Sequence, residues 1–278
     1  MKSYEKACSS REYRGRFMPQ KDVHEHNLAE LEKKGYLSCL TEEEWKSKFP
    51  KIDAEKVFYM NGIGAGTAYY DGTIFVNVST RNSVSTPEQI QNQVLAAIVE
   101  QEKCRKQKEY IRLLLPAPAW LIPEMLSNIL ELDGPSAQFY EVFWAFYEVI
   151  KPNISSFGPF IWEQLKRMKA EEQVEETRKY LDRDFSEDDI MVYLGWNKES
   201  VRPEQATAWK TTIESAFHSA WGCEGKEPKL TNGIVRKEQV LEYFHQDRKE
   251  GAEAEIIVVP CQVKVQKTVS LAEVEANI

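Results

Sequence analysis

The chain has 278 residues, 42% of them hydrophobic and 29% charged, so it can bury a sizeable core in one large or two modest domains. Its formal net charge of −8 disfavours long-range attraction to nucleic acids or anionic membranes. The longest apolar runs, such as 256–260, are far shorter than the roughly 20 residues that a membrane-spanning helix needs.

The N-terminal sequence and the cysteines bear on the cellular compartment. Residues 1–20 carry charges of both signs without an apolar segment, which is not typical of a secretory signal. The five cysteines are scattered and form no C-x-x-C pair, which favours reduced thiols. The four histidines do not have metal-ligand spacing. We therefore expect a soluble, cytoplasmic protein with no metal site and no cofactor.

Local signals in the first part of the chain predict short helices around one β-hairpin. A helix is expected over 22–34, and Thr41 and Glu44 have the spacing of a capping box that opens another before Pro50. A strand over 57–60 leads into a glycine-rich stretch. The dipeptide Asp71-Gly72 is a strong hairpin signal and joins the expected strands 68–70 and 73–78.

Helical periodicity dominates the prediction for the rest of the chain. Thr86 and Gln89 form a second capping box, and an amphipathic helix is expected to continue to about Leu114. Further helices are expected over 121–132, 136–150, 160–182, 186–195, 203–221 and 235–249, and a strand over 255–269. With about eight helices and a small antiparallel β-hairpin or sheet, the predicted class is mainly α, with α+β character as a minority element.

Composition shifts suggest four segments. Residues 1–20 are expected to form a polar arm, and 21–151 a helical region that contains the hairpin 56–78. A turn within 152–159 opens a second helical region, 152–253. Residues 254–278 are expected to form a C-terminal strand or arm able to add to a neighbour's sheet edge.

The glycine-rich stretch 61–67 contains the candidate ligand-binding residues Gly62, Gly64 and Gly66. A dinucleotide-binding loop requires its glycines between a strand and a helix, whereas here a second strand follows. A turn that binds no ligand is the simpler interpretation. A pocket near the hairpin 61–78 is the alternative.

The strand 73–78 and the following helix, with V-L-A-A-I-V-E-Q at 94–101, resemble the strand-then-helix layout that precedes H-E-x-x-H in zinc metallopeptidases. Those enzymes need two histidine ligands and a glutamate that activates the zinc-bound water. The corresponding positions here hold Ala97, Ile98 and Gln101. The resemblance implies at most a catalytically inactive metallopeptidase-like fold, and we assign no catalytic residue.

Two charged segments invite a nucleic-acid interpretation. The spacing of apolar and turn residues in 186–201 resembles that of a helix-turn-helix. Nearby acidic residues and Pro203 favour instead an ordinary helix that ends at Gly195. The densest basic cluster either binds RNA or another polyanion, or is a solvated helix face. Its members are Lys103, Arg105, Lys106, Lys108 and Arg112.

Aromatic residues are concentrated between 139 and 162, where they predict either a core or an interface. The candidate interface residues are Phe139, Tyr140, Phe143, Trp144, Phe157 and Trp162.

The absence of a catalytic signature favours a non-enzymatic protein that acts by protein–protein interaction or self-assembly, as a scaffold or a structural, viral coat-like protein. The expected partner is another protein or the chain itself in a homo-oligomer; nucleic acid is disfavoured by the net charge, and no membrane is expected. The alternatives are an enzyme or small-ligand binder with a pocket near the hairpin, and an RNA-binding protein that uses the basic cluster.

Overall fold

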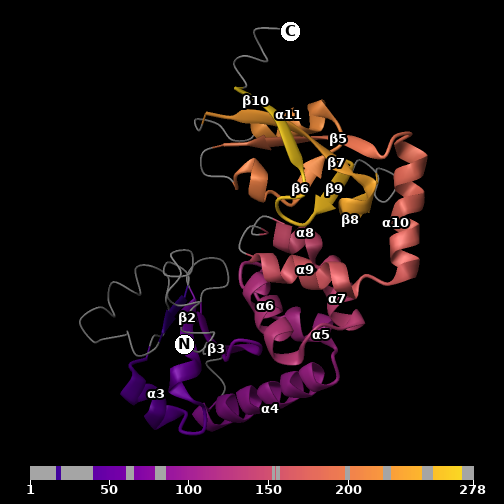
Figure 1. The fold of residues 1–278 in the computed structure, drawn as a ribbon. Coiled ribbons are helices and arrows are strands. Elements are labelled where there is room, and N and C mark those ends of the chain that lie inside the picture. Colours follow the sequence, from indigo (N-terminus) through magenta and orange to yellow (C-terminus); the bar gives the residue numbers. More distant parts are fainter. Residues whose placement is uncertain are drawn as a thin grey trace. The chain divides into compact units, whose positions relative to one another are not determined.

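The chain divides into two compact units, Met1–Pro152 and Asn153–Ile278 (Figure 1). The computed structural model describes residues 17–19, 40–60, 66–78, 86–151, 154, 157–197, 201–221, 227–245 and 253–270. The helix expected over 22–34 lies outside these residues. The join between the units falls at the start of the turn expected within 152–159.

The first unit contains a four-stranded antiparallel sheet in the order β1-β2-β3-β4. The hairpin expected at Asp71-Gly72 is confirmed, and it joins β3 to β4 with Tyr70 opposite Phe75. The Asp71 carboxylate accepts hydrogen bonds from the backbone N–H groups of Thr73 and Ile74, which fixes the turn. The strands are β1 (Phe17–Pro19), β2 (Val57–Met60), β3 (Gly66–Tyr70) and β4 (Phe75–Val78).

Both predicted capping boxes are confirmed at the starts of helices in this unit. Thr41 Oγ1 accepts from the N–H of Glu44, and Thr86 Oγ1 accepts from the N–H of Gln89. The second helix ends at Lys106 rather than near 114, because Lys108 adopts a left-handed backbone with φ 57°. The helices are α3 (Glu42–Lys48), α4 (Pro87–Lys106), α5 (Tyr110–Leu114), α6 (Ile122–Asp133), α7 (Ala137–Ala145) and α8 (Tyr147–Ile150), with the 3₁₀ turn η3 (Ala54–Lys56).

The second unit is built around a six-stranded antiparallel sheet in the order β10-β7-β5-β6-β9-β8. The class is therefore α+β, and the prediction of a mainly α protein with a small hairpin is wrong. The strands are β5 (Asp189–Trp196), β6 (Ala208–Lys210), β7 (Lys229–Arg236), β8 (Val240–Phe244), β9 (Glu255–Val258) and β10 (Lys264–Ser270). The helical elements are α9 (Pro159–Met168), α10 (Glu171–Asp184), α11 (Ile213–Trp221), η5 (Pro203–Gln205) and η6 (Lys237–Gln239).

Strand β5 replaces the helix expected over 186–195, and the described part of 235–249 forms the end of β7, the turn η6 and strand β8, because alternate side chains of the strands face the core. In β5, Ile190 and Val192 are buried while Met191 between them is exposed, and Val235 of β7 pairs with Ile190. The helix-turn-helix interpretation fails for the same reason. The expected C-terminal strand is two strands, and both pair within their own chain: β9 with β6 and β8, and β10 with β7.

Helix α11 packs directly on β5 at Gly195. A Cβ atom at this position would lie 2.1 Å from the carbonyl oxygen of Ala216 and 2.6 Å from the backbone nitrogen of Ala220. Glycine is therefore required for close approach of helix to strand, and not for a helix end as the sequence suggested. None of the helices in the described ranges is both long and apolar enough to cross a membrane.

Candidate functional site

The structure describes only one of the three candidate ligand-binding glycines. Gly66 is the first residue of β3 and lies opposite Met60 of β2. Gly62 and Gly64 lie outside the described residues. Where it is described, the glycine-rich stretch is thus an ordinary strand pairing.

The layout that resembles zinc metallopeptidases is present as strand β4 followed by helix α4, and Ala97, Ile98 and Gln101 stand at the positions of the functional residues. Gln101 is buried, and its side-chain oxygen accepts a 3.3 Å hydrogen bond from the backbone N–H of Phe75 at the start of β4. Ala97 and Ile98 are half-buried on the same helix. In the described ranges no three histidine, cysteine or acidic side chains come together as metal ligands. Gln101 thus attaches the helix to the sheet.

A polar junction lies where the β3–β4 turn meets helix α6. The hydroxyl oxygen of Tyr70 is 2.9 Å from the carbonyl oxygen of Gly72 and 2.9 Å from Oε1 of Glu124. The side-chain amide of Asn128 donates to the Gly72 carbonyl at 2.7 Å and is 3.4 Å from the Tyr70 hydroxyl. Burial raises the pKa of Glu124 to about 7, although its hydrogen bonds with Tyr70 and Asn128 lower the pKa. We name these four residues the hairpin–α6 junction.

This junction could not be predicted from the sequence, because Glu124 is one acid among 44 and belongs to no recognisable motif. Its position in the first turn of an apolar helix, one turn before a buried asparagine, is a signal only once the fold is known.

The aromatic candidates belong mainly to the interior of their own chain. Their rings contact one another, as when Phe157 meets Trp162 edge to face with centroids 6.3 Å apart. Trp144 is half-buried, and five are buried: Phe139, Tyr140, Phe143, Phe157 and Trp162.

The basic cluster of α4 and α5 divides into paired and unpaired cations. Arg105 forms a 2.7 Å ion pair with Asp133, and Arg112 pairs with Glu100 at 3.0 Å and with Glu109. The remaining members are exposed, and none forms an ion pair with a residue that the structure describes: Lys103, Lys106 and Lys108.

Large apolar side chains lie next to these lysines. Val99 is 64% exposed and precedes Glu100, while Ile111 is 50% exposed and precedes Arg112, the partner of Glu100. Leu115, one helical turn after Ile111, is 66% exposed. The Glu100–Arg112 ion pair joins the two helices that carry these apolar side chains. We name these three apolar residues and the three unpaired lysines the α4–α5 surface.

Helix α10 in the second unit presents the opposite charge. Val174 is 51% exposed and lies among four exposed glutamates. We name this set the α10 acidic face: Glu171, Glu172, Val174, Glu175 and Glu176. Within the described ranges none of the four carboxylates forms an ion pair.

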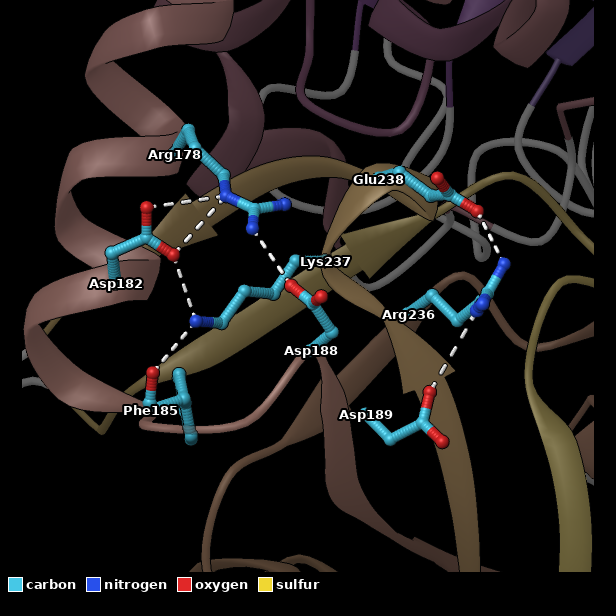
Figure 2. A network of polar contacts seen from close by, with 8 residues as sticks. All are labelled: Arg178, Asp182, Phe185, Asp188, Asp189, Arg236, Lys237 and Glu238. Atoms are coloured by element: carbon cyan, nitrogen blue, oxygen red, sulfur yellow. Dashed lines mark hydrogen bonds and ion pairs between the residues drawn. The ribbon is translucent and has the colours of Figure 1, made fainter.

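The opposite face of α10 is fastened at both ends by buried lysines. Before the helix, the Lys169 ammonium donates to the Leu241 carbonyl of β8 and to Thr177 Oγ1, both at 2.5 Å. After the helix, the Lys237 ammonium donates to Asp182 and to the Phe185 carbonyl (Figure 2). These contacts direct the acidic face away from the sheet.

Charge and exposure thus distinguish the α4–α5 surface and the α10 acidic face. The lysines could be located from the sequence, but the exposed apolar residues and the α10 acidic face could not, since exposure depends on the fold. Comparison with known proteins gives no match, whether to a family model, a curated protein or a solved structure.

Proposed function

We propose that this protein acts by self-association and not by catalysis, and that its α4–α5 surface binds the α10 acidic face of a second copy. The observation that carries the proposal is the exposure of Val99, Ile111 and Leu115 in a segment whose three exposed lysines form no ion pair with a described residue. Apolar side chains that are grouped on a surface and rimmed by charges are typical of protein-binding sites, whereas scattered ones are not.

The α4 side of the contact has a regular helical spacing. Val99, Lys103 and Lys106 follow one another at i, i+4 and i+7, so they share one face of the helix. The two lysines belong to the last turn of α4, where their charges also complement the negative end of the helix dipole.

The α10 side is complementary in charge. Glu171, Val174 and Glu175 occupy neighbouring positions on one exposed face, and Glu171 belongs to the first turn. If the two helices pack antiparallel, Val99 meets Val174 and the lysines of α4 lie beside the first-turn glutamates of α10. Antiparallel helix dipoles also attract one another.

Such a contact is modest in strength, since exposed ion pairs contribute at most about 1 kcal/mol each. It becomes stable when a closed dimer uses it twice, or when it repeats head to tail along a ring or a chain of copies. Dependence on salt concentration is therefore expected.

Two charge-reversal variants test the contact between copies. Lys103→Glu with Lys106→Glu makes both surfaces acidic, and Glu171→Lys with Glu175→Lys makes both basic. Each variant alone is expected to lose association at least about tenfold, measured by size-exclusion chromatography with light scattering. An equimolar mixture is expected to associate again, because each acidic surface then finds a basic one on the other variant.

The control is Lys264→Glu with Lys267→Glu, which makes the same change in net charge on exposed residues of β10. This variant is expected to associate as the unmodified protein does. A mixture that stays monomeric would refute the contact between copies, and an equal loss in the control would attribute the effect to net charge alone.

The two alternatives have less support. An RNA-binding role would use the basic cluster, yet Arg105 and Arg112 are already paired with acids. Excess absorbance at 260 nm across the eluted peak would favour it over self-association. A ligand pocket at the glycine-rich stretch would use residues that the structure does not describe, and no observation favours it.

A further inference from the structure

The Tyr70 hydroxyl in the hairpin–α6 junction has two acceptors and one hydrogen. Its oxygen lies 2.9 Å from both the Gly72 carbonyl and the Glu124 carboxyl. A phenol donates one hydrogen bond, and a carbonyl oxygen never donates. Both contacts are therefore hydrogen bonds at the same moment only if Glu124 carries a proton and donates it to the Tyr70 oxygen.

The ionised form of Glu124 requires a different arrangement. A carboxylate only accepts, so the Tyr70 hydrogen must then turn toward Glu124. The Gly72 carbonyl keeps the 2.7 Å hydrogen bond from Asn128 but loses the one from Tyr70. The Gly72 carbonyl thus accepts hydrogen bonds from two side chains in one state and from a single side chain in the other.

We propose that the hairpin–α6 junction is a proton-dependent fastening of the β3–β4 turn, in which Tyr70 donates to Gly72 when Glu124 is neutral and to Glu124 when it is ionised. Glu124 is half-buried and so can exchange its proton with solvent. The proposal is independent of the self-association described above.

The surroundings of Glu124 favour its neutral form. The pKa of Glu124 responds to its burial and to hydrogen bonds with Tyr70 and Asn128, and no charged side chain is among its causes. Glu124 forms no ion pair with any residue of the described ranges. Burial raises its pKa to about 7, from an ordinary value of 4.5, and this places the change near neutral pH.

Linkage fixes the sign of the effect. Between pH 4.5 and about 7 the folded protein holds the Glu124 proton more tightly than the unfolded chain does. The contribution of Glu124 to stability is therefore greatest at acidic pH and falls as pH rises through this window. Between pH 4.5 and about 7, the unfolding constant of the unmodified protein is expected to rise by on the order of a hundredfold more than that of Glu124→Gln. The neutral amide of the variant can donate to Tyr70 at every pH.

The direct test is amide hydrogen exchange of Thr73 and Ile74, the turn residues whose N–H groups bond to Asp71. Their protection factors are expected to fall as pH rises through about 7 in the unmodified protein and to stay level in Glu124→Gln. Tyr70→Phe removes the hydroxyl but leaves Glu124 buried, so the global free energy of unfolding still depends on pH in this variant. The fall in protection at Thr73 and Ile74 beyond that global change is expected to disappear in Tyr70→Phe. An excess local fall that persists in Tyr70→Phe would overturn the proposal.

A second measurement needs no substitution. Carbon-13 spectra of the unmodified protein report the titration of the Glu124 carboxyl directly. A midpoint near 7 supports the proposal, and a midpoint near the ordinary value of 4.5 would overturn it even if both variants failed to fold.

Discussion

The ammonium group of Lys237 lies 2.8 Å from the carboxylate of Asp182, so that η6 is joined to the last turn of α10 (Figure 2). The same ammonium donates to the Phe185 carbonyl at 2.7 Å, and the lysine side chain is only 4% exposed. A cation at this position satisfies a carbonyl that the helix leaves unpaired and complements the helix dipole. The link holds α10 in the orientation that exposes its acidic face.

Lys237→Met is expected to lower the free energy of unfolding by about 1–3 kcal/mol. Methionine fills the volume of the lysine stem but leaves the buried carbonyl without its donor. Urea unfolding at neutral pH measures the loss. The matched control is Arg236→Met, because Arg236 is 64% exposed and pairs with Glu238. The control should cost less than about 1 kcal/mol, and equal losses would contradict the role given to Lys237.

Lys169 should give a distinct pH signature at the other end of α10. Burial is the main reason that the pKa of Lys169 lies below its ordinary value of 10.5. Just below pH 10.5 the unfolded chain therefore binds more protons than the folded protein, and the contribution of Lys169 to stability rises with pH. Urea unfolding compared between the unmodified protein and Lys169→Met isolates this contribution, because tyrosine titration is common to both. Parallel pH profiles would show that Lys169 keeps its ordinary pKa.

Gly195→Ala is expected to destabilise the second unit by more than about 2 kcal/mol. The new methyl would lie 2.1 Å from the Ala216 carbonyl, so α11 would have to move away from β5. Thermal unfolding followed by circular dichroism measures the loss. Gly158→Ala is the control, since no atom lies within 4 Å of its added Cβ. Equal stability of the two variants would contradict the close packing of α11 on β5.

Gln101→Met tests whether this position has a structural role. The substitution leaves the backbone N–H of Phe75 without its acceptor in a buried place, and about 1–3 kcal/mol of stability should be lost. Gln107→Met, at an exposed helix end, should be nearly neutral. Chemical denaturation of both variants gives the comparison. A neutral Gln101→Met would mean that this side chain does not attach α4 to the sheet.

Local signals predicted the first unit better than the second. The capping boxes at Thr41 and Thr86 and the turn at Asp71-Gly72 depend on side chains within a few residues of the backbone they bond. The break between α9 and α10 depends instead on Lys169 reaching Leu241, which is 72 residues away. No local pattern in 160–182 indicates that contact, so a single helix was expected there.

Strands β5 to β8 of the second unit were missed because long-range pairing decides their structure. Residues 186–195 carry helix-start signals, yet Ile190 and Val192 alternate with exposed residues. The helix-start signals outweighed that short alternation in the prediction. Ile190 pairs with Val235, which lies far along the chain. The candidate sites show the same difference between local signals and long-range contacts. The lysines of α4 are visible in the sequence, but the Tyr70–Glu124 contact joins residues 54 positions apart.

Light scattering on the unmodified protein tests the central claim most directly. One copy has a mass of 32.2 kDa. At low salt and at concentrations up to hundreds of micromolar, we expect a larger mass that falls toward that of one copy as salt screens the charges of the α4–α5 surface. A mass of 32.2 kDa at every concentration in low salt would contradict self-association.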